Sequence, residues 1–170
     1  MAEIIRTYRE ELPRARFVGR RYTESDRVNG SFTAHWGTWF GNGWFDVIEK
    51  ANPGRLLDGS YVGLMLGDEG MDCSYWIGIL CAEDAAVPEG FAAVELPAAA
   101  AAVCWIRGPE GPELYGMHDA CVRAMREAGM ADWYRLPDGS LIFFERYSCP
   151  RFTTPDEQGR VILDYGAYLA

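Results

Sequence analysis

The chain has 170 residues, of which 49% are hydrophobic and 14% aromatic, and its net charge is −9. This composition is typical of one folded domain or two small fused halves, and it argues against a disordered chain. The negative charge and the lack of a basic stripe argue against direct nucleic-acid binding, and the apolar stretches are too interrupted to span a bilayer.

Five cysteines, an odd number, occur among apolar neighbours, and no two stand at CxxC spacing. We interpret them as reduced core residues of a cytoplasmic protein, because the N-terminus also lacks the apolar core of a signal peptide. The two histidines, His35 and His118, lie far apart in the sequence without clustered ligands. The sequence therefore predicts neither a metal site nor a cofactor, and we interpret both histidines as structural.

Six strands and two main helices are expected. The first helix begins near Ser31 and places aromatic residues on one stripe, and Gly41-Asn42-Gly43 ends or bends it. The second helix opens at Pro112 and ends at Gly129. The strands are predicted at Arg16–Tyr22, Tyr61–Leu66, Cys73–Leu80, Ala102–Arg107, Leu141–Tyr147 and Val161–Leu169.

The order of these elements repeats. Glu11-Leu12-Pro13 and Glu95-Leu96-Pro97 each precede a strand, a helix and two more strands. We therefore expect an α+β fold made of a tandem pseudo-repeat, with halves at about residues 4–86 and 87–170 of a single domain. The two strand-helix-strand-strand units would form an antiparallel sheet structure with both helices on one side. The groove between the halves is the expected ligand cleft.

The predicted strand Leu141–Tyr147 carries an acid on an apolar face. Alternate residues share a face of a strand, so Phe143, Glu145 and Tyr147 point together. An unpaired buried carboxylate is costly, so Glu145 must meet a cation, collect hydrogen bonds or take a raised pKa. The alternatives are a structural ion pair with an arginine such as Arg107, or an edge strand on which this glutamate is solvated.

Several short segments, in this order, resemble the GyrI-like (gyrase-inhibitor-like) small-molecule-binding domains. The resemblance covers residues 4–169. The segments that carry it are Leu12-Pro13 ahead of Phe17-Val18-Gly19, Trp36-Gly37-Thr38-Trp39-Phe40, Tyr75-Trp76-Ile77-Gly78-Ile79, Phe144-Glu145-Arg146-Tyr147 and Val161-Ile162-Leu163-Asp164-Tyr165.

Such domains serve as effector-binding domains of AraC-type and MerR-type multidrug regulators, where a buried glutamate meets cationic aromatic drugs. The resemblance implies that Glu145 is the central acid and that Tyr147 orients it or holds the ligand. Its implied ligand-binding residues are Glu145, Tyr147, Tyr75, Trp76, Trp39, Phe40, Trp105 and Phe143. We expect Trp36, Trp44 and Trp133 to serve core packing.

Three functions are compatible with the resemblance. The first is a standalone protein that binds aromatic, cationic or electrophilic compounds. The second is a hydrolase that opens cyclopropane-type DNA-alkylating compounds, with Glu145 and Tyr147 as its catalytic residues. The third is a DNA gyrase inhibitor or a regulatory partner protein. We expect the domain to fill the chain, which disfavours a regulator with its own DNA-binding module.

Overall fold

The computed structural model describes residues 1–68 and 73–170. Its elements follow one another along the chain as β1 (Glu3–Leu12), β2 (Ala15–Thr23), the short 3-10 turn η1 (Glu24–Asp26), α1 (Thr33–Asn42), α2 (Trp44–Ala51), β3 (Leu56–Gly67), β4 (Ser74–Ala82), β5 (Ala92–Leu96), β6 (Ala99–Pro109), α3 (Pro112–Tyr115), α4 (His118–Glu127), β7 (Leu141–Tyr147) and β8 (Arg160–Tyr168). The predicted α+β class is confirmed, and so are all six predicted strands.

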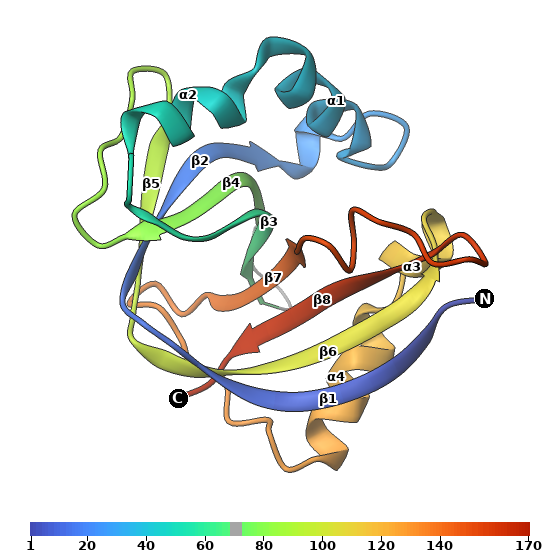
Figure 1. The fold of residues 1–170 in the computed structure, drawn as a ribbon. Coiled ribbons are helices and arrows are strands. Elements are labelled where there is room, and N and C mark those ends of the chain that lie inside the picture. The colour runs from blue at the N-terminus through green and yellow to red at the C-terminus, as the bar shows by residue number, and fades with distance from the viewer. Residues whose placement is uncertain (69–72) are drawn as a thin grey trace.

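All eight strands form one antiparallel sheet in the order β1-β6-β8-β7-β3-β4-β2-β5. The pair β3 and β7 lies at the centre and joins the two halves. On one side of this pair follow β4 and β2, and on the other side follow β8 and β6, so the halves are related as the repeated sequence order predicts (Figure 1).

The two strands that the sequence did not predict, β1 and β5, exchange between the halves. β1 precedes β2 in the chain but pairs with β6, and β5 precedes β6 but pairs with β2. Both are edge strands. β1 carries charged residues on both faces, and β5 is short and alanine-rich, so neither shows the alternation of a half-buried strand. Each half is therefore completed by a strand from the other.

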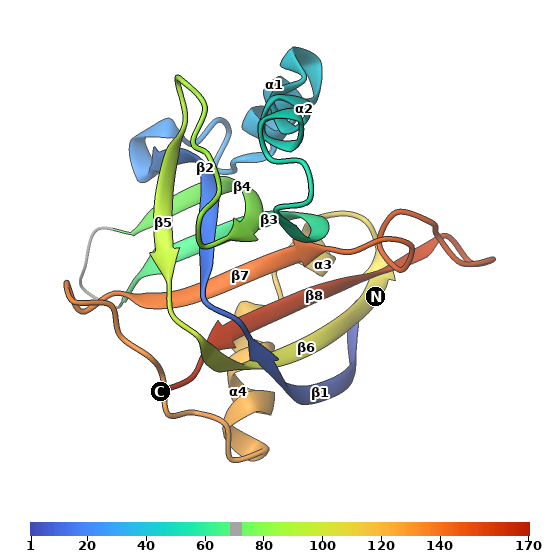
Figure 2. The ribbon, with the colours of Figure 1, turned by 60° about the vertical axis from the view of Figure 1, so that its left-hand side comes forward.

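Both helix pairs cover the same face of the sheet (Figures 1 and 2). α1 and α2 meet at Gly43, whose left-handed backbone (φ 65°) produces the predicted bend. The second predicted helix is interrupted, since α3 ends at Gly116 and α4 starts afresh at His118. Among the described residues, no helix has the length and apolar character needed to cross a membrane.

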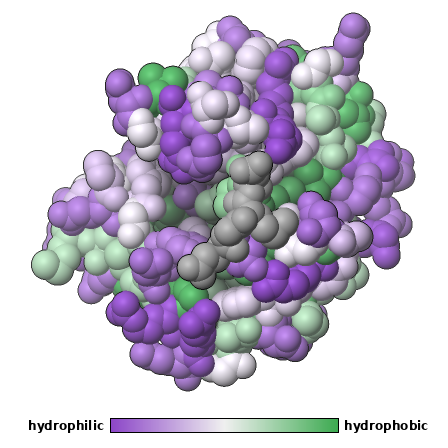
Figure 3. Space-filling view, turned by 180° about the vertical axis from the view of Figure 1, so that it is seen from behind, coloured by the Kyte–Doolittle hydropathy of each residue, from purple (hydrophilic) through white to green (hydrophobic). Residues whose placement is uncertain are grey.

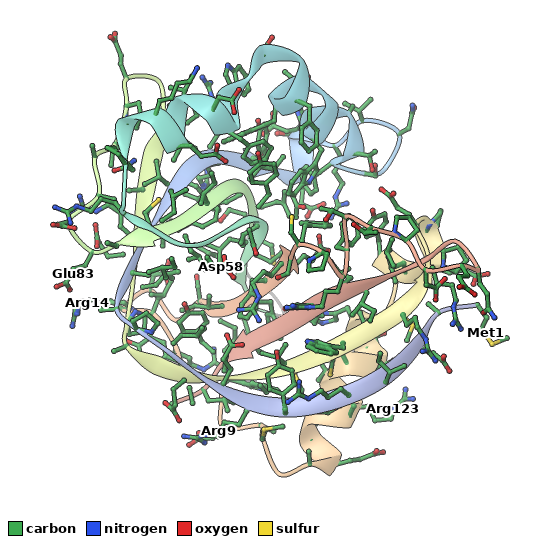
Figure 4. The ribbon with its side chains drawn as sticks, viewed as in Figure 1. Met1, Arg9, Arg14, Asp58, Glu83 and Arg123 are labelled. Carbon is green, nitrogen blue, oxygen red and sulfur yellow. The ribbon has the colours of Figure 1, made fainter. Side chains whose placement is uncertain are left out.

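The opposite face of the sheet is also buried, because the sheet curls around it (Figure 2). Phe17, Val62, Trp76 and Phe144 pack there, and none is more than 7% exposed. Most charged side chains of the described residues lie at the periphery, whereas Arg146 and Asp164 are buried. Figure 4 shows Arg14 and Glu83 side by side at the outside of the molecule, where their side chains form a 3.6 Å ion pair.

Candidate functional site

A cavity of about 1410 Å³ lies on the helix-covered face, above the central strands β3 and β7. Ligand pockets usually have about 300–1,000 Å³, so this space is sufficient for a drug-sized molecule. Viewed from behind, the molecule is hollowed near its centre, with hydrophilic residues above and below the hollow and hydrophobic residues toward the right (Figure 3). Both halves contribute side chains to the cavity, among them Phe32 and Trp36 from the first half and Tyr115, His118, Trp133, Phe143, Glu145, Tyr147 and Tyr165 from the second.

Glu145 lies at the floor of this cavity, in the middle of β7, and receives hydrogen bonds from two strands. The hydroxyl of Tyr147 donates to its Oε2 at 2.6 Å, and the hydroxyl of Tyr75, on β4, lies 3.5 Å from the same oxygen. The indole Nε1 of Trp36, on α1, donates to the Tyr75 hydroxyl at 2.9 Å. The Glu145 carboxylate is thus bonded to Tyr147 and Tyr75, and Tyr75 connects it to Trp36 of α1.

Burial raises the pKa of the Glu145 carboxyl above its ordinary value of 4.5, and the hydrogen bonds from Tyr147 and Tyr75 lower it in part. Burial and the nearby carboxylate also raise the pKa of both tyrosines, so their hydroxyls stay protonated and act as donors. Arg107, the structural partner considered above, pairs with Glu3 at 2.6 Å instead. Among the described residues, the ion pairs place no arginine or lysine on Glu145.

Gly63 provides the space for this arrangement. It lies directly opposite Glu145 in the pairing of β3 with β7. A Cβ atom at this position would lie 2.5 Å from the Tyr75 hydroxyl and 3.3 Å from Glu145 Oε2. Since any side chain here would displace the Tyr75 hydroxyl, a glycine is required for close approach.

Aromatic rings surround the acid. Phe32 stacks on Tyr75 with their centroids 4.4 Å apart, and the edge of Trp36 meets Tyr147 at 4.8 Å. Phe152 packs edge-on against Tyr147 at 4.7 Å. A ligand beside Glu145 would therefore meet aromatic faces and edges on several sides, which suits a flat or aryl-substituted molecule.

The α4 side of the cavity holds a second polar pair. His118 Nδ1 shares a hydrogen bond with the hydroxyl of Tyr165, a residue that lies opposite Glu145 in the pairing of β7 with β8. Phe143 packs between His118, at 5.2 Å, and Trp133, at 5.9 Å. In the described part of the chain, no three His, Cys, Asp or Glu side chains gather as a metal site would require.

No family model matches the chain, and neither does any curated protein. Solved structures do match. SAV2435 bound to tetraphenylphosphonium has a TM-score of 0.67 at 15% identity, over 98% of this chain and 94% of that one. A Staphylococcus aureus MU50 chain named for bacterial transcription regulation has a TM-score of 0.64 at 15% identity, over 97% and 99%. The EcmrR C-terminal domain has a TM-score of 0.57 at 17% identity, over 96% of each chain.

The resemblance to GyrI-like domains holds at the level of the fold. The likeness extends over nearly the whole of this chain and of these three structures, and it includes both halves of the sheet. At 15–17% identity, a likeness of this kind concerns the backbone. The side chains of this chain must therefore carry the argument about its ligand.

Four of the residues that the resemblance implied lie together in the cavity: Glu145, Tyr147, Tyr75 and Phe143. Two of the others lie on the opposite face of the sheet. Trp76 follows Tyr75 on β4 and packs against Phe17, and Trp105 packs against Tyr8 between β6 and β1. Because neighbouring strand residues point to opposite faces, Trp76 cannot share the cavity with Tyr75.

The two remaining implied residues, on α1, also lie elsewhere. Trp39 is fully buried beneath the helix, where its Nε1 donates to the Tyr22 hydroxyl at 2.9 Å. Phe40 is 61% exposed and lies near Tyr61, outside the cavity lining. The stripe of aromatic residues was predicted, but its spacing does not decide which ring faces the sheet and which faces the cavity.

The sequence prediction missed several residues of the cavity. Trp36, Trp133 and His118 were interpreted as structural, yet all three line it. Tyr165 belongs to a segment that carries the family resemblance but was not predicted as a site residue, although it lies opposite Glu145 on the neighbouring strand. Only the strand register brings these two residues together, and periodicity within a strand does not supply that register.

Proposed function

We propose that this protein binds small aromatic cations in the cavity, with Glu145 as the negative charge that faces them. The observation that carries the proposal is a carboxylate at the floor of an aromatic cavity, bonded to tyrosine hydroxyls and not to an arginine or lysine of the described residues. Arginines do line the cavity, but the ion pairs of the described residues join none of them to Glu145, and a ligand cation would supply a positive charge beside it.

The physical chemistry of the cavity supports this class of ligand. A cation near an aromatic face gains about 0.5–2 kcal/mol, and more when water is excluded. The cavity supplies such rings from the start of α1 and from β4 and β7, namely Phe32 at the N-cap of α1, Trp36, Tyr75 and Tyr147. The net charge of −9 also favours the approach of cations. The similar structure of SAV2435 was solved bound to tetraphenylphosphonium, an aryl cation of this kind.

A titration with tetraphenylphosphonium tests the proposal, with tryptophan fluorescence as the signal. We expect saturable quenching for the wild type, weaker quenching in Trp36→Phe, where Trp133 is the tryptophan left in the cavity lining, and no such weakening in Trp105→Phe. The pair is matched because Trp36 lines the cavity and Trp105 lies on the other face of the sheet. Quenching that depended on Trp105 and not on Trp36 would show that the cation binds elsewhere.

A hydrolase is the second candidate, and it rests on one specific observation. Glu145 has a raised pKa and accepts a 2.6 Å hydrogen bond from Tyr147, a combination suited to proton transfer. Glu145 would remove a proton from water while the water oxygen attacks a strained ring carbon. The C–C bond of the ring would break, and the carbon that keeps its electron pair would take up a proton, which Glu145 can return. Catalytic consumption of a cyclopropane-type alkylating compound by the wild type and not by Glu145→Gln would favour this function over simple binding.

A further inference from the structure

We propose that Arg151 and Phe152, in the connection between β7 and β8, are positioning residues that hold Tyr147 on Glu145 from outside the cavity. The inference rests on the proposed function, in which Glu145 faces the ligand. It assigns a role to an ion cluster on the opposite face of the sheet, which the ligand itself does not reach. This ion cluster consists of Glu10, Arg146, Arg151 and Asp164.

Arg151 is fixed to the sheet by its side chain and its backbone. Its Nε donates to Asp164 Oδ1 at 2.7 Å, and its Nη2 bonds to the second oxygen of the same carboxylate. Asp164 lies on β8 and is fully buried. The Arg151 carbonyl accepts a 2.9 Å hydrogen bond from the backbone N–H of Ile162, and its guanidinium lies 4.8 Å from the ring centroid of Trp105.

The next residue, Phe152, faces the cavity side. Its backbone N–H donates to the Ser148 carbonyl at 2.8 Å, which closes a tight turn directly after β7. Its ring meets the ring of Tyr147 edge-on at 4.7 Å, and Trp36 meets the same ring at 4.8 Å. The ring of Tyr147 therefore contacts two other rings, and its hydroxyl reaches Glu145 Oε2 at 2.6 Å.

The ion cluster also fixes β7 between Glu145 and Tyr147. Arg146 stands between Glu145 and Tyr147 and points to the opposite face, where its Nε donates to Asp164 at 2.9 Å. Its two remaining nitrogens bond to Glu10 of β1, at 2.7 and 3.0 Å. Asp164 is thus bonded by Arg146 of β7 and by Arg151 of the connection that follows. Arg151 bonds both oxygens of the carboxylate, and the two arginines together restrict the positions of both segments.

The titratable groups around Glu145 make its pKa a suitable measure of this arrangement. They are four tyrosines, Tyr75 on β4, Tyr115 on α3, Tyr147 on β7 and Tyr165 on β8, and beyond them the imidazole of His118 on α4, which bonds to Tyr165 and lines the same cavity. Burial raises the pKa of all four tyrosines, so they stay protonated while Glu145 titrates. A change in the Glu145 pKa then reports its hydrogen bonds and its hydration.

The test is a double-mutant cycle in which the measured quantity is the Glu145 pKa. This pKa is measured by ¹³C carboxyl NMR without ligand, and Glu145→Gln assigns the signal. The four proteins are the wild type, Arg151→Lys, Tyr147→Phe and the double variant. Arg151→Lys keeps the charge but loses the two parallel hydrogen bonds. We expect it to raise the Glu145 pKa when the Tyr147 hydroxyl is present, and to cause no further shift in the Tyr147→Phe protein.

Arg160→Lys is the matched control, because Arg160, the first residue of β8, pairs at 2.9 Å with Asp156 of the same connection and not with Asp164. It should leave the Glu145 pKa unchanged. Phe152→Leu repeats the test without altering the ion cluster. An unchanged pKa in Arg151→Lys and Phe152→Leu, or equal shifts with and without the Tyr147 hydroxyl, would overturn the inference. If the protein did not bind cations but the Glu145 pKa shifted as expected, the proposed function would be overturned and the positioning role of Arg151 and Phe152 would stand.

Discussion

At the scale of single residues, Glu145 is subject to two opposing influences. Burial disfavours its charged form, and hydrogen bonds from Tyr147 and Tyr75 favour it. Burial is the stronger influence, so the carboxyl keeps a proton at a higher pH than an ordinary glutamate. A bound cation would favour the charged form, and cation binding should therefore weaken as the pH falls through the pKa of this group.

The same raised pKa predicts how stability depends on pH. A group whose pKa is higher in the folded than in the unfolded protein stabilises the fold at low pH, and this contribution is lost as the pH rises through the folded-state value. For Glu145 the loss begins near the ordinary value of 4.5 and continues above it. In urea unfolding between pH 4.5 and 8, we expect the free energy of unfolding of the wild type to fall relative to that of Glu145→Gln. A constant difference between the two proteins would contradict the raised pKa.

Gly63→Ala tests whether close approach at β3 is needed for the site. The added methyl would lie 2.5 Å from the Tyr75 hydroxyl, so we expect a loss of stability of about 1–3 kcal/mol and weaker cation binding. Gly37→Ala, in α1, is the control because its Cβ would meet open space, and it should stabilise the helix by about 0.5–1 kcal/mol. Denaturant unfolding of both variants checks the prediction, and equal effects would contradict it.

At the scale of elements, β7 shows what sequence periodicity can and cannot predict. Alternation correctly placed Phe143, Glu145 and Tyr147 on one face, and the residues between them, Phe144 and Arg146, lie on the other. The same rule would have separated Tyr75 from Trp76, but the family resemblance grouped them. The sequence could not predict the exchange of β1 and β5, because pairing between distant edge strands leaves no local pattern.

For the helices, the sequence predicts where they bend and end but not which aromatic ring faces the cavity. The bend at Gly43 and the end of α4 before Gly129 were predictable from glycine positions. The ring that faces the cavity was not, because Trp36 and Trp39 are separated by less than one turn. Only the packing of α1 on the sheet decides that Trp39 is buried and that Trp36 reaches Tyr75.

The buried ion cluster should contribute strongly to the stability of β7 and β8. Arg146→Met would leave the buried Asp164 with only one of its two arginines and would remove the arginine that pairs with the partly exposed Glu10, and we expect a loss of about 3 kcal/mol. Arg9→Met is the matched control. Arg9 points outward at the edge of the molecule in Figure 4 and pairs with Glu11, and both side chains are more than half exposed. Its loss should cost about 0–1 kcal/mol in the same unfolding experiment. A similar small loss for both variants would refute a stabilising role for the cluster.

At the scale of the whole molecule, the pseudo-repeat creates the site. The two central strands bring Gly63 of one half opposite Glu145 of the other, and the helices of both halves leave a cavity above them. The exchanged strands β1 and β5 tie the halves together at both edges of the sheet. Neither half alone would hold the carboxylate, its donors and the aromatic walls in one place.

The affinity of Glu145→Gln for tetraphenylphosphonium, measured by calorimetry beside the wild type, tests the central claim most directly. Glu110→Gln is the matched control, because it removes a carboxylate from the same cavity lining but away from the floor. We expect Glu145→Gln to bind the cation about tenfold more weakly or worse, and Glu110→Gln to change little. The neutral triphenylphosphine oxide should not distinguish the three proteins. Equal affinity of Glu145→Gln and wild type for the cation would contradict the account.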